Sequence, residues 1–173
     1  MKVKSLKGTL LVYGTAMAVS GVAFGATDGT EGATSTGTAE VSIVKGATVQ
    51  ITGLNDVTLT ESGTDYVAAD NVCVYSTGVP YNVTMTSSAA SGFQLTSGSN
   101  TLAYSVTWTD EDGTPATVSE GTPLTGQTST GDATCSTSGG TNTKFEITVA
   151  SADYTAAVAG SYTDTLTIVV APD

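Results

Sequence analysis

Residues 102–110 read L-A-Y-S-V-T-W-T-D and alternate apolar with small or polar residues. One side of an extended chain would carry the four apolar residues of this segment, which are Leu102, Tyr104, Val106 and Trp108. A period of two is typical of a strand that buries one face and exposes the other. The segment therefore predicts a single β-strand whose apolar side chains belong to a hydrophobic core.

The same period of two recurs along the chain, between turn-rich stretches of glycine, serine and asparagine. Further strands are predicted at 47–52, 56–60, 71–75, 81–86, 93–95, 145–149 and 166–170. Residues 110–142 are polar with few apolar positions, and a helical turn is expected only within 150–160. Seven or eight short strands in about 130 residues indicate an all-β fold, an antiparallel β-sandwich or barrel.

The first 25 residues have the composition of an export signal. Three lysines precede an apolar run over 10–22, and Ala23 and Gly25 supply small residues before a cleavage point. A membrane anchor is the alternative, but the apolar run is short for a membrane span. We therefore expect residues 1–25 to be a signal peptide, with no membrane insertion after its removal.

Charge and composition limit the function. The chain contains five lysines, no arginine and no histidine, against sixteen acidic residues, so loss of the signal's three lysines leaves a net charge of 2 − 16 = −14. Such an acidic surface repels nucleic acid and anionic lipid. Histidine and arginine supply most acid–base and phosphoryl-transfer chemistry. We expect a non-enzymatic protein without a metal or cofactor.

A flexible leader and an unusual strand precede the body of the chain. Residues 26–37 are small and polar and contain too little apolar surface to order themselves. In the following stretch, 38–46, Ala39, Val41 and Ile43 alternate with polar residues. We interpret 38–46 as a strand made for a neighbouring molecule and 47–173 as the folded domain. The alternative is that 38–44 is the first strand of this domain.

The two cysteines, Cys73 and Cys135, predict a disulfide, because paired cysteines in an exported chain are usually oxidised. Two free or metal-binding thiols are the alternative, although no histidine is present to complete a zinc site.

Other features admit a functional and a structural interpretation. The stretch 110–113, D-E-D-G, concentrates oxygen ligands as a calcium loop does, but it lacks the full spacing and fits an exposed hairpin turn. Tyr81, Tyr104 and Trp108 could line a sugar site, but on alternating strands such aromatic residues are more often core. Lys144 could activate a serine, and nothing around it in the sequence supports that role.

Several of these segments together resemble a known family. An N-terminal alternating strand, V-C-V-Y-S-T-G-V-P-Y-N-V-T-M at 72–85, L-A-Y-S-V-T-W-T-D at 102–110 and G-S-Y-T-D-T-L-T-I-V-V at 160–170 are similar to the chaperone–usher pilins. The resemblance is to the spore coat U domain group of archaic pili and, more distantly, to major subunits of the colonisation-factor type. Cys135 departs from the archaic pattern, in which a cysteine usually lies nearer the mature N-terminus.

The resemblance implies an immunoglobulin-like sandwich that lacks its last strand. In such pilins the N-terminal extension of the next subunit fills the open groove by strand addition. The donor residues here would be Ala39, Val41 and Ile43, and the acceptor groove wall would include Leu166, Ile168 and Val170.

The function expected from these features is that of a structural pilus subunit at the cell surface. It would be exported through the periplasm, assisted by a periplasmic chaperone and an outer-membrane usher, and would polymerise with identical or related pilins to support adhesion or biofilm formation. The alternative is a secreted β-sandwich adhesin or carbohydrate-binding module that acts as a monomer.

Overall fold

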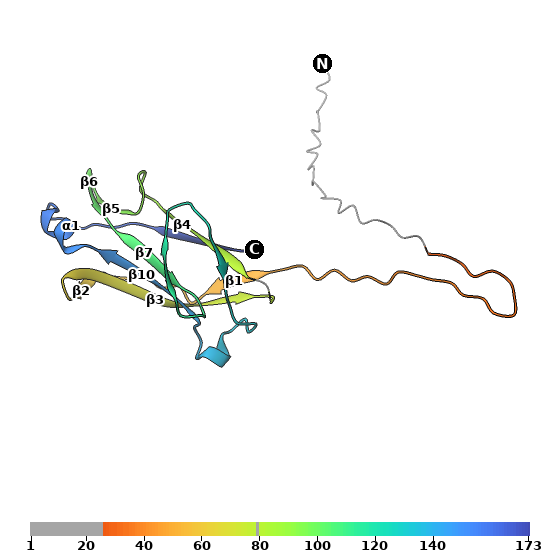
Figure 1. Ribbon diagram of the computed structural model, residues 1–173. Coiled ribbons are helices and arrows are strands. Elements are labelled where there is room, and N and C mark those ends of the chain that lie inside the picture. The colour runs from red at the N-terminus through yellow and green to blue at the C-terminus, as the bar shows by residue number, and fades with distance from the viewer. Residues whose placement is uncertain (1–25, 79) are drawn as a thin grey trace, which may run out of the picture. The chain divides into compact units, whose positions relative to one another are not determined.

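The computed structural model describes residues 26–78 and 80–173, and the predicted signal, 1–25, lies outside them. The described chain falls into two compact units, which divide between Val44 and Lys45. In the first unit Thr27 and Thr38 exchange backbone hydrogen bonds of 3.0 and 2.9 Å, and no strand is formed over 39–48. All the sheets lie in the second unit (Figure 1).

The second unit is an antiparallel β-sandwich, as predicted. Its larger sheet has the order β1 (Val49–Thr52), β3 (Asp65–Ser76), β10 (Thr143–Val149), β7 (Ser105–Thr109) and β8 (Pro115–Val118), with β2 (Thr60–Ser62) paired to the start of β3. The smaller sheet has the order β11 (Leu166–Pro172), β4 (Tyr81–Ser87) and β9 (Leu124–Gln127). A hairpin of β5 (Gln94–Ser97) and β6 (Asn100–Ala103), a 3₁₀ turn Ser136–Ser138 and the helix α1 (Ser151–Ala156) complete it.

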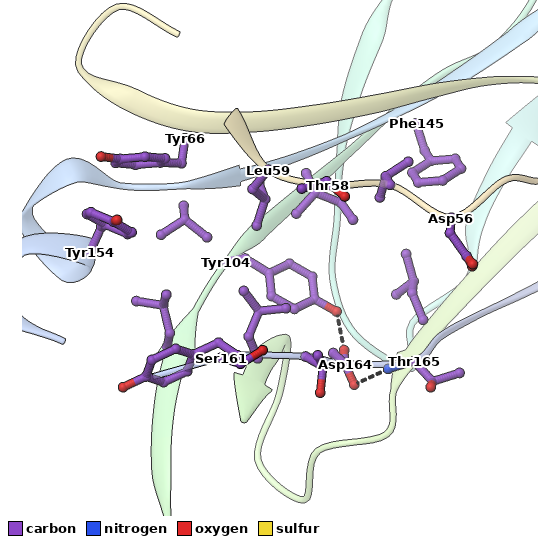
Figure 2. Close-up of a pocket in the computed structure, with 18 of the residues that line it drawn as sticks. Asp56, Thr58, Leu59, Tyr66, Tyr104, Phe145, Tyr154, Ser161, Asp164 and Thr165 are labelled. Atoms are coloured by element: carbon purple, nitrogen blue, oxygen red, sulfur yellow. Dashed lines mark hydrogen bonds between the residues drawn. The ribbon is translucent and has the colours of Figure 1, made fainter. Parts of the chain in front are cut away.

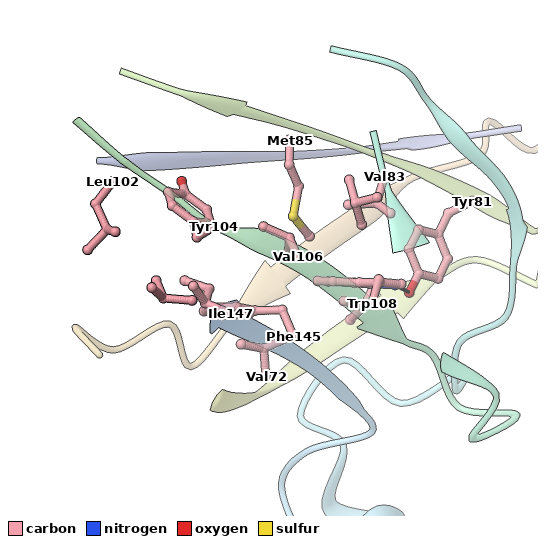
Figure 3. Packing of buried hydrophobic residues seen from close by; sticks show 13 residues of the cluster. Val72, Tyr81, Val83, Met85, Leu102, Tyr104, Val106, Trp108, Phe145 and Ile147 are labelled. Atoms are coloured by element: carbon pink, nitrogen blue, oxygen red, sulfur yellow. Dashed lines mark hydrogen bonds between the residues drawn. The ribbon is translucent and has the colours of Figure 1, made fainter. Parts of the chain in front are cut away.

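The core lies between the two sheets and is made by the inward positions of the alternating strands (Figure 3). Trp108, Val106 and Val83 are fully buried, as are Tyr81 and Met85. Leu102 and Tyr104 are also buried, so all four apolar residues of 102–108 belong to the core as predicted. Burial of each large side chain contributes roughly 1.5–3 kcal/mol to folding.

Three sequence-based expectations about strands were wrong. Residues 102–108 are not one strand, because the backbone N–H of Tyr104 donates to Phe93 O at 3.0 Å and separates β6 from β7. Residues 56–60 are not a strand either, since only Thr60 enters β2. The polar region 110–142, in which no strand was predicted, contains both β8 and β9. The expected helical turn in 150–160 is confirmed as α1.

The disulfide prediction is confirmed: Cys73 and Cys135 are bonded, with a Cα–Cα distance of 5.8 Å. The bridge ties the polar segment after β9 to the end of β3. Within the described residues, no helix is long and apolar enough to cross a membrane.

Candidate groove beside the last strand

A groove of about 780 Å³ opens between the two sheets of the second unit (Figure 2). One wall is formed by the segment 54–59 and the other by the segment 160–165 with the start of β11. Its floor is apolar and consists of side chains from β3, β10 and the β5–β6–β7 region, namely Tyr66, Leu95, Leu102, Tyr104, Phe145, Ile147 and Val149. The core is therefore reachable from outside along this groove.

Strand β11 forms one wall and has a hydrogen-bonded neighbour, β4, on one side. Its inward residues Leu166 and Ile168 are half-buried and line the groove, whereas Val169 on the outer face is 53% exposed. Just before β11, the backbone groups of Thr163 and Thr165 bond to Thr96 and Ser88. Along a strand, the N–H and C=O groups of successive residues point alternately to one side and to the other. Because those of the odd-numbered residues are bonded on the β4 side, those of the even-numbered residues point away from β4, along the groove.

The predicted groove residue Val170 has a different position from the other two. It is half-buried against the core but does not line the cavity. Strand β1 lies next to β11. The structure thus brings together Leu166 and Ile168 in the groove and leaves Val170 beside β1.

The opposite wall is irregular for a local reason. Gly53 adopts a φ of +83°, and the next residues turn away from the β1 ladder. The backbone N–H of Asn55 then donates to Asp70 Oδ2 at 2.7 Å, and its side-chain amide donates to Asp70 Oδ1 at 3.2 Å. Side-chain bonds of this kind replace strand pairing. The segment 54–59 is held near β3 without closing the groove.

Asp164 anchors the wall on the β11 side. Its carboxylate accepts hydrogen bonds from the Tyr104 hydroxyl at 2.5 Å and from the Ser87 hydroxyl at 2.7 Å. The Ser88 hydroxyl and backbone N–H add bonds of 2.6 and 3.0 Å. Burial alone would raise the pKa of Asp164, but the hydrogen bonds from Ser88, Tyr104 and Ser87 outweigh it and lower the pKa. All these donors are neutral, so the negative charge has no cationic partner among the described residues.

The end of the groove next to α1 is aromatic. The rings of Tyr66 and Tyr154 stack with centroids 3.8 Å apart (Figure 2), and Tyr162 also lines the groove. The Tyr162 hydroxyl donates to Val158 O at 2.8 Å and fixes the approach to β11. These tyrosines were not predicted, because their proximity depends on residues about 90 positions apart in the chain.

The predicted donor residues lie in the first unit and are accessible. Val41 and Ile43 are each 95% exposed, and Val44 is 93% exposed. Ala39 is also exposed. Full exposure of consecutive apolar residues is unfavourable in water, since burying a valine or isoleucine gains roughly 1.5–3 kcal/mol. The segment therefore has the properties of a binding surface, whose apolar side chains become buried on contact with another molecule.

The chemistry and form of the groove suit a bound peptide. The side chains that line it are apolar, aromatic, hydroxyl, amide or carboxylate groups. Its long, open form and the outward-facing backbone of β11 match an extended peptide that adds a strand to a sheet edge.

No protein-family model matches the chain, and no curated protein matches it. Among solved structures, it is similar to a chain in a study entitled "Chaperone-tip adhesin complex is vital for synergistic activation of CFA/I fimbriae biogenesis". The identity is 15%, the TM-score is 0.48, and the match covers 72% of this chain and 42% of the other, so it spans less than half of that chain's length. The function proposed below does not depend on this likeness.

Proposed function

We propose that this protein is a structural subunit of a bacterial surface pilus and polymerises by donor-strand exchange. In this proposal the segment 38–46 of one subunit enters the groove of the next and pairs with β11. The sandwich is then an immunoglobulin-like fold whose missing last strand comes from its neighbour. The role is non-enzymatic and requires no cofactor.

One combination of features supports the proposal. The groove has an apolar floor beside a strand edge whose backbone groups face it. The same chain carries an alternating segment with Val41 and Ile43 95% exposed. An apolar groove at a free strand edge is an aggregation hazard for an isolated chain. A periplasmic chaperone, followed by an outer-membrane usher and the next subunit, would cover it during export to the cell surface.

A second candidate is a secreted sandwich that binds carbohydrate as a monomer, in adhesion. The observation in its favour is Tyr154, which is 49% exposed at the mouth of the groove. Its ring is already stacked on Tyr66, so a sugar would have to compete for that face or use the other one.

The test uses residues 26–173 and two aspartate substitutions on neighbouring positions. Val41→Asp places a charge on the apolar face of the donor segment, whereas Ser42→Asp places the same charge on the polar face. We expect the parent chain and Ser42→Asp to form ladders that resist mild detergent, and Val41→Asp to remain monomeric. Peptide 34–45 added to Val41→Asp should raise its melting temperature, because the groove of that variant is intact.

Equal ladders from both variants, or no ladder from the parent together with glycan binding by the monomer, would contradict the pilus assignment. The carbohydrate alternative predicts that Tyr154→Ala abolishes binding on a glycan array without changing the oligomeric state.

A further inference from the structure

The two lysines outside the predicted signal differ in their surroundings. Lys144 forms an ion pair with Glu146 at 3.1 Å. Lys45 has no ion pair in the part of the chain that the structure describes. In the alternating stretch, Lys45 follows Val41 and Ile43 at the same spacing of two and falls on their face. The donor segment thus ends in a positive charge on the side that would enter a groove.

The groove is lined by two carboxylates, Asp56 on the wall 54–59 and Asp164 on the wall beside β11, and the one that continues the β11 strand is Asp164. Asp164 continues the inward alternation of Leu166 and Ile168 by one step, lines the groove and is ionised because its pKa is lowered. Its hydrogen-bond donors are neutral, as described above. The neighbouring inward positions, Tyr162 on one side and Leu166 on the other, offer no charge to a lysine.

We propose that Lys45 of a second copy of this chain pairs with Asp164 and sets the direction and register of the inserted strand. The inference rests on the proposed function and adds to it the alignment of the two strands. The inserted segment runs antiparallel to β11, with Ile43 opposite Leu166 and Val41 opposite Ile168. Directly opposite residues share a face in an antiparallel pair, so these side chains all enter the groove.

Other alignments are disfavoured by where they place Lys45. A shift of two residues toward the end of β11 puts the ammonium beside Leu166, which offers it no charged partner on this strand. A parallel strand that keeps Val41 and Ile43 over Leu166 and Ile168 puts Lys45 beside Val170, which is also uncharged. Of these three alignments, the antiparallel register with Asp164 places a carboxylate directly opposite Lys45 and buries both apolar residues.

Side-chain size supports the same register. In it Ala39 falls opposite Val170, which does not line the groove and belongs to a strand that neighbours β1. Gly37 follows at the next inward position. The smallest residues of the donor segment thus coincide with the part of β11 outside the groove, and the larger ones with the groove.

The register can be measured with engineered cysteines on the outer face of the strands. The alignment places Ser42 opposite Thr167, and both side chains are exposed. The backbone of Thr167 faces β4, so this is a non-hydrogen-bonded pair across the new ladder, with side chains about 4.5–5.5 Å apart. That spacing permits a disulfide, whereas the diagonal neighbours of a pair are roughly 7–8 Å away.

The experiment compares three double variants of residues 26–173, each containing Ser42→Cys. The second substitution is Thr167→Cys, or the shifted controls Thr165→Cys and Val169→Cys. Under mild oxidation we expect chain-to-chain adducts in most of the Thr167→Cys sample and at least fivefold fewer in either control. Adding Lys45→Met should lower the yield of the adduct with Thr167→Cys and raise the yields with Thr165→Cys and Val169→Cys. Adding Lys45→Arg should leave all three yields unchanged.

Several outcomes would overturn the register. These are a shifted pair that cross-links best, an adduct within one chain, ladders without adducts from any pair, or an unchanged pattern in Lys45→Met. Failure of the proposed function has a different signature, since no variant, including the parent, would then form detergent-resistant ladders.

Discussion

The hydroxyl of Tyr104 donates a 2.5 Å hydrogen bond to the carboxylate of Asp164, 60 residues later in the chain. Tyr104 lies at the break between β6 and β7, and Asp164 lies just before β11. The bond therefore joins the region of the larger sheet to the last strand of the smaller one. It fixes the position of the wall beside which β11 begins.

Tyr104→Phe should destabilise the protein by roughly 1.5–3 kcal/mol, the usual contribution of a hydrogen bond to a charged group. The ring remains and preserves the packing against Phe93, whose centroid is 5.4 Å away. Urea unfolding of residues 26–173 measures the loss. Tyr75→Phe, a half-buried position, is the matched control and should change stability by less than about 0.5 kcal/mol. Equal losses in the two variants would mean that the bond to Asp164 contributes little.

Acid should destabilise the protein through two carboxylates. The pKa of Asp164 is lowered as described, and that of Asp132 is lowered by hydrogen bonds from Ser136 and Thr134. A carboxyl whose native pKa lies below the unfolded value of about 3.9 adds stability above that pH and loses it as the pH falls further. We expect unfolding free energies to be constant from pH 7 to about 5 and to decrease below about 4.

Asp164→Asn and Asp132→Asn should each reduce this acid dependence, with a smaller slope of stability against pH below about 4. A slope identical to that of the parent in both variants would assign the acid sensitivity to other carboxylates. Denaturant titrations at fixed ionic strength give the slopes.

Tyr81 should produce the opposite dependence at high pH. Its hydroxyl is buried and accepts a 3.2 Å hydrogen bond from Trp108 Nε1. Burial raises the pKa of Tyr81 to about 12. Because the unfolded value is about 10, stability due to neutral Tyr81 is complete below pH 10 and is lost as the pH rises toward 12.

In a titration to high pH, part of the tyrosinate absorbance should accordingly appear at a higher pH than the rest, together with unfolding. This part is the late-ionising fraction. Tyr81→Phe should reduce this fraction and leave the contribution of Tyr104, whose pKa is raised by burial and by Asp164. It should also cost about 1–3 kcal/mol at neutral pH, since the buried Trp108 N–H loses its partner. A late fraction of unchanged size in Tyr81→Phe, with the loss confined to the early part of the curve, would show that Tyr81 ionises early.

Replacement of both cysteines by serine should cost about 4 kcal/mol, by the loop-entropy estimate for a long cross-linked loop. The bridged residues are 62 positions apart. Thermal unfolding of the oxidised parent, the reduced parent and Cys73→Ser/Cys135→Ser measures the effect. The reduced parent should resemble the serine variant; a reduced parent as stable as the oxidised one would contradict the estimate.

The parts of the fold that were predictable have strong local patterns. Strands β4, β10 and β11 alternate over five or more residues and face the core on one side, so their period identifies them. Strands β8 and β9 are edge strands of their sheets and contain few large apolar residues. Their sequences have little periodic alternation, which explains why no strand was predicted there.

The groove was only partly predictable. Leu166 and Ile168 follow from the alternation of the last strand. The hydrogen bonds from Asn55 to the Asp70 carboxylate replace the strand pairing expected over 56–60. The alternation of apolar and polar residues in the sequence does not indicate which of these two kinds of hydrogen bond will form. Asp164 gathers donors from positions 60 to 77 residues earlier. Hydrogen bonds between residues so far apart in the chain depend on the folded structure. No local sequence pattern around Asp164 predicts them.

The position of β10 has a consequence for the order of folding. It lies in the larger sheet between β3 and β7, yet it is made of residues 143–149, after every other strand of that sheet. Until this segment has been synthesised, β3 and β7 each expose a long unsatisfied edge. Non-local pairing of this kind is slow, with folding times in the millisecond to second range. A chain that stalls before residue 143 therefore has two unpaired strand edges and no segment to cover them, so a chain that emerges from its N-terminus onward is exposed to aggregation until residue 149 is available.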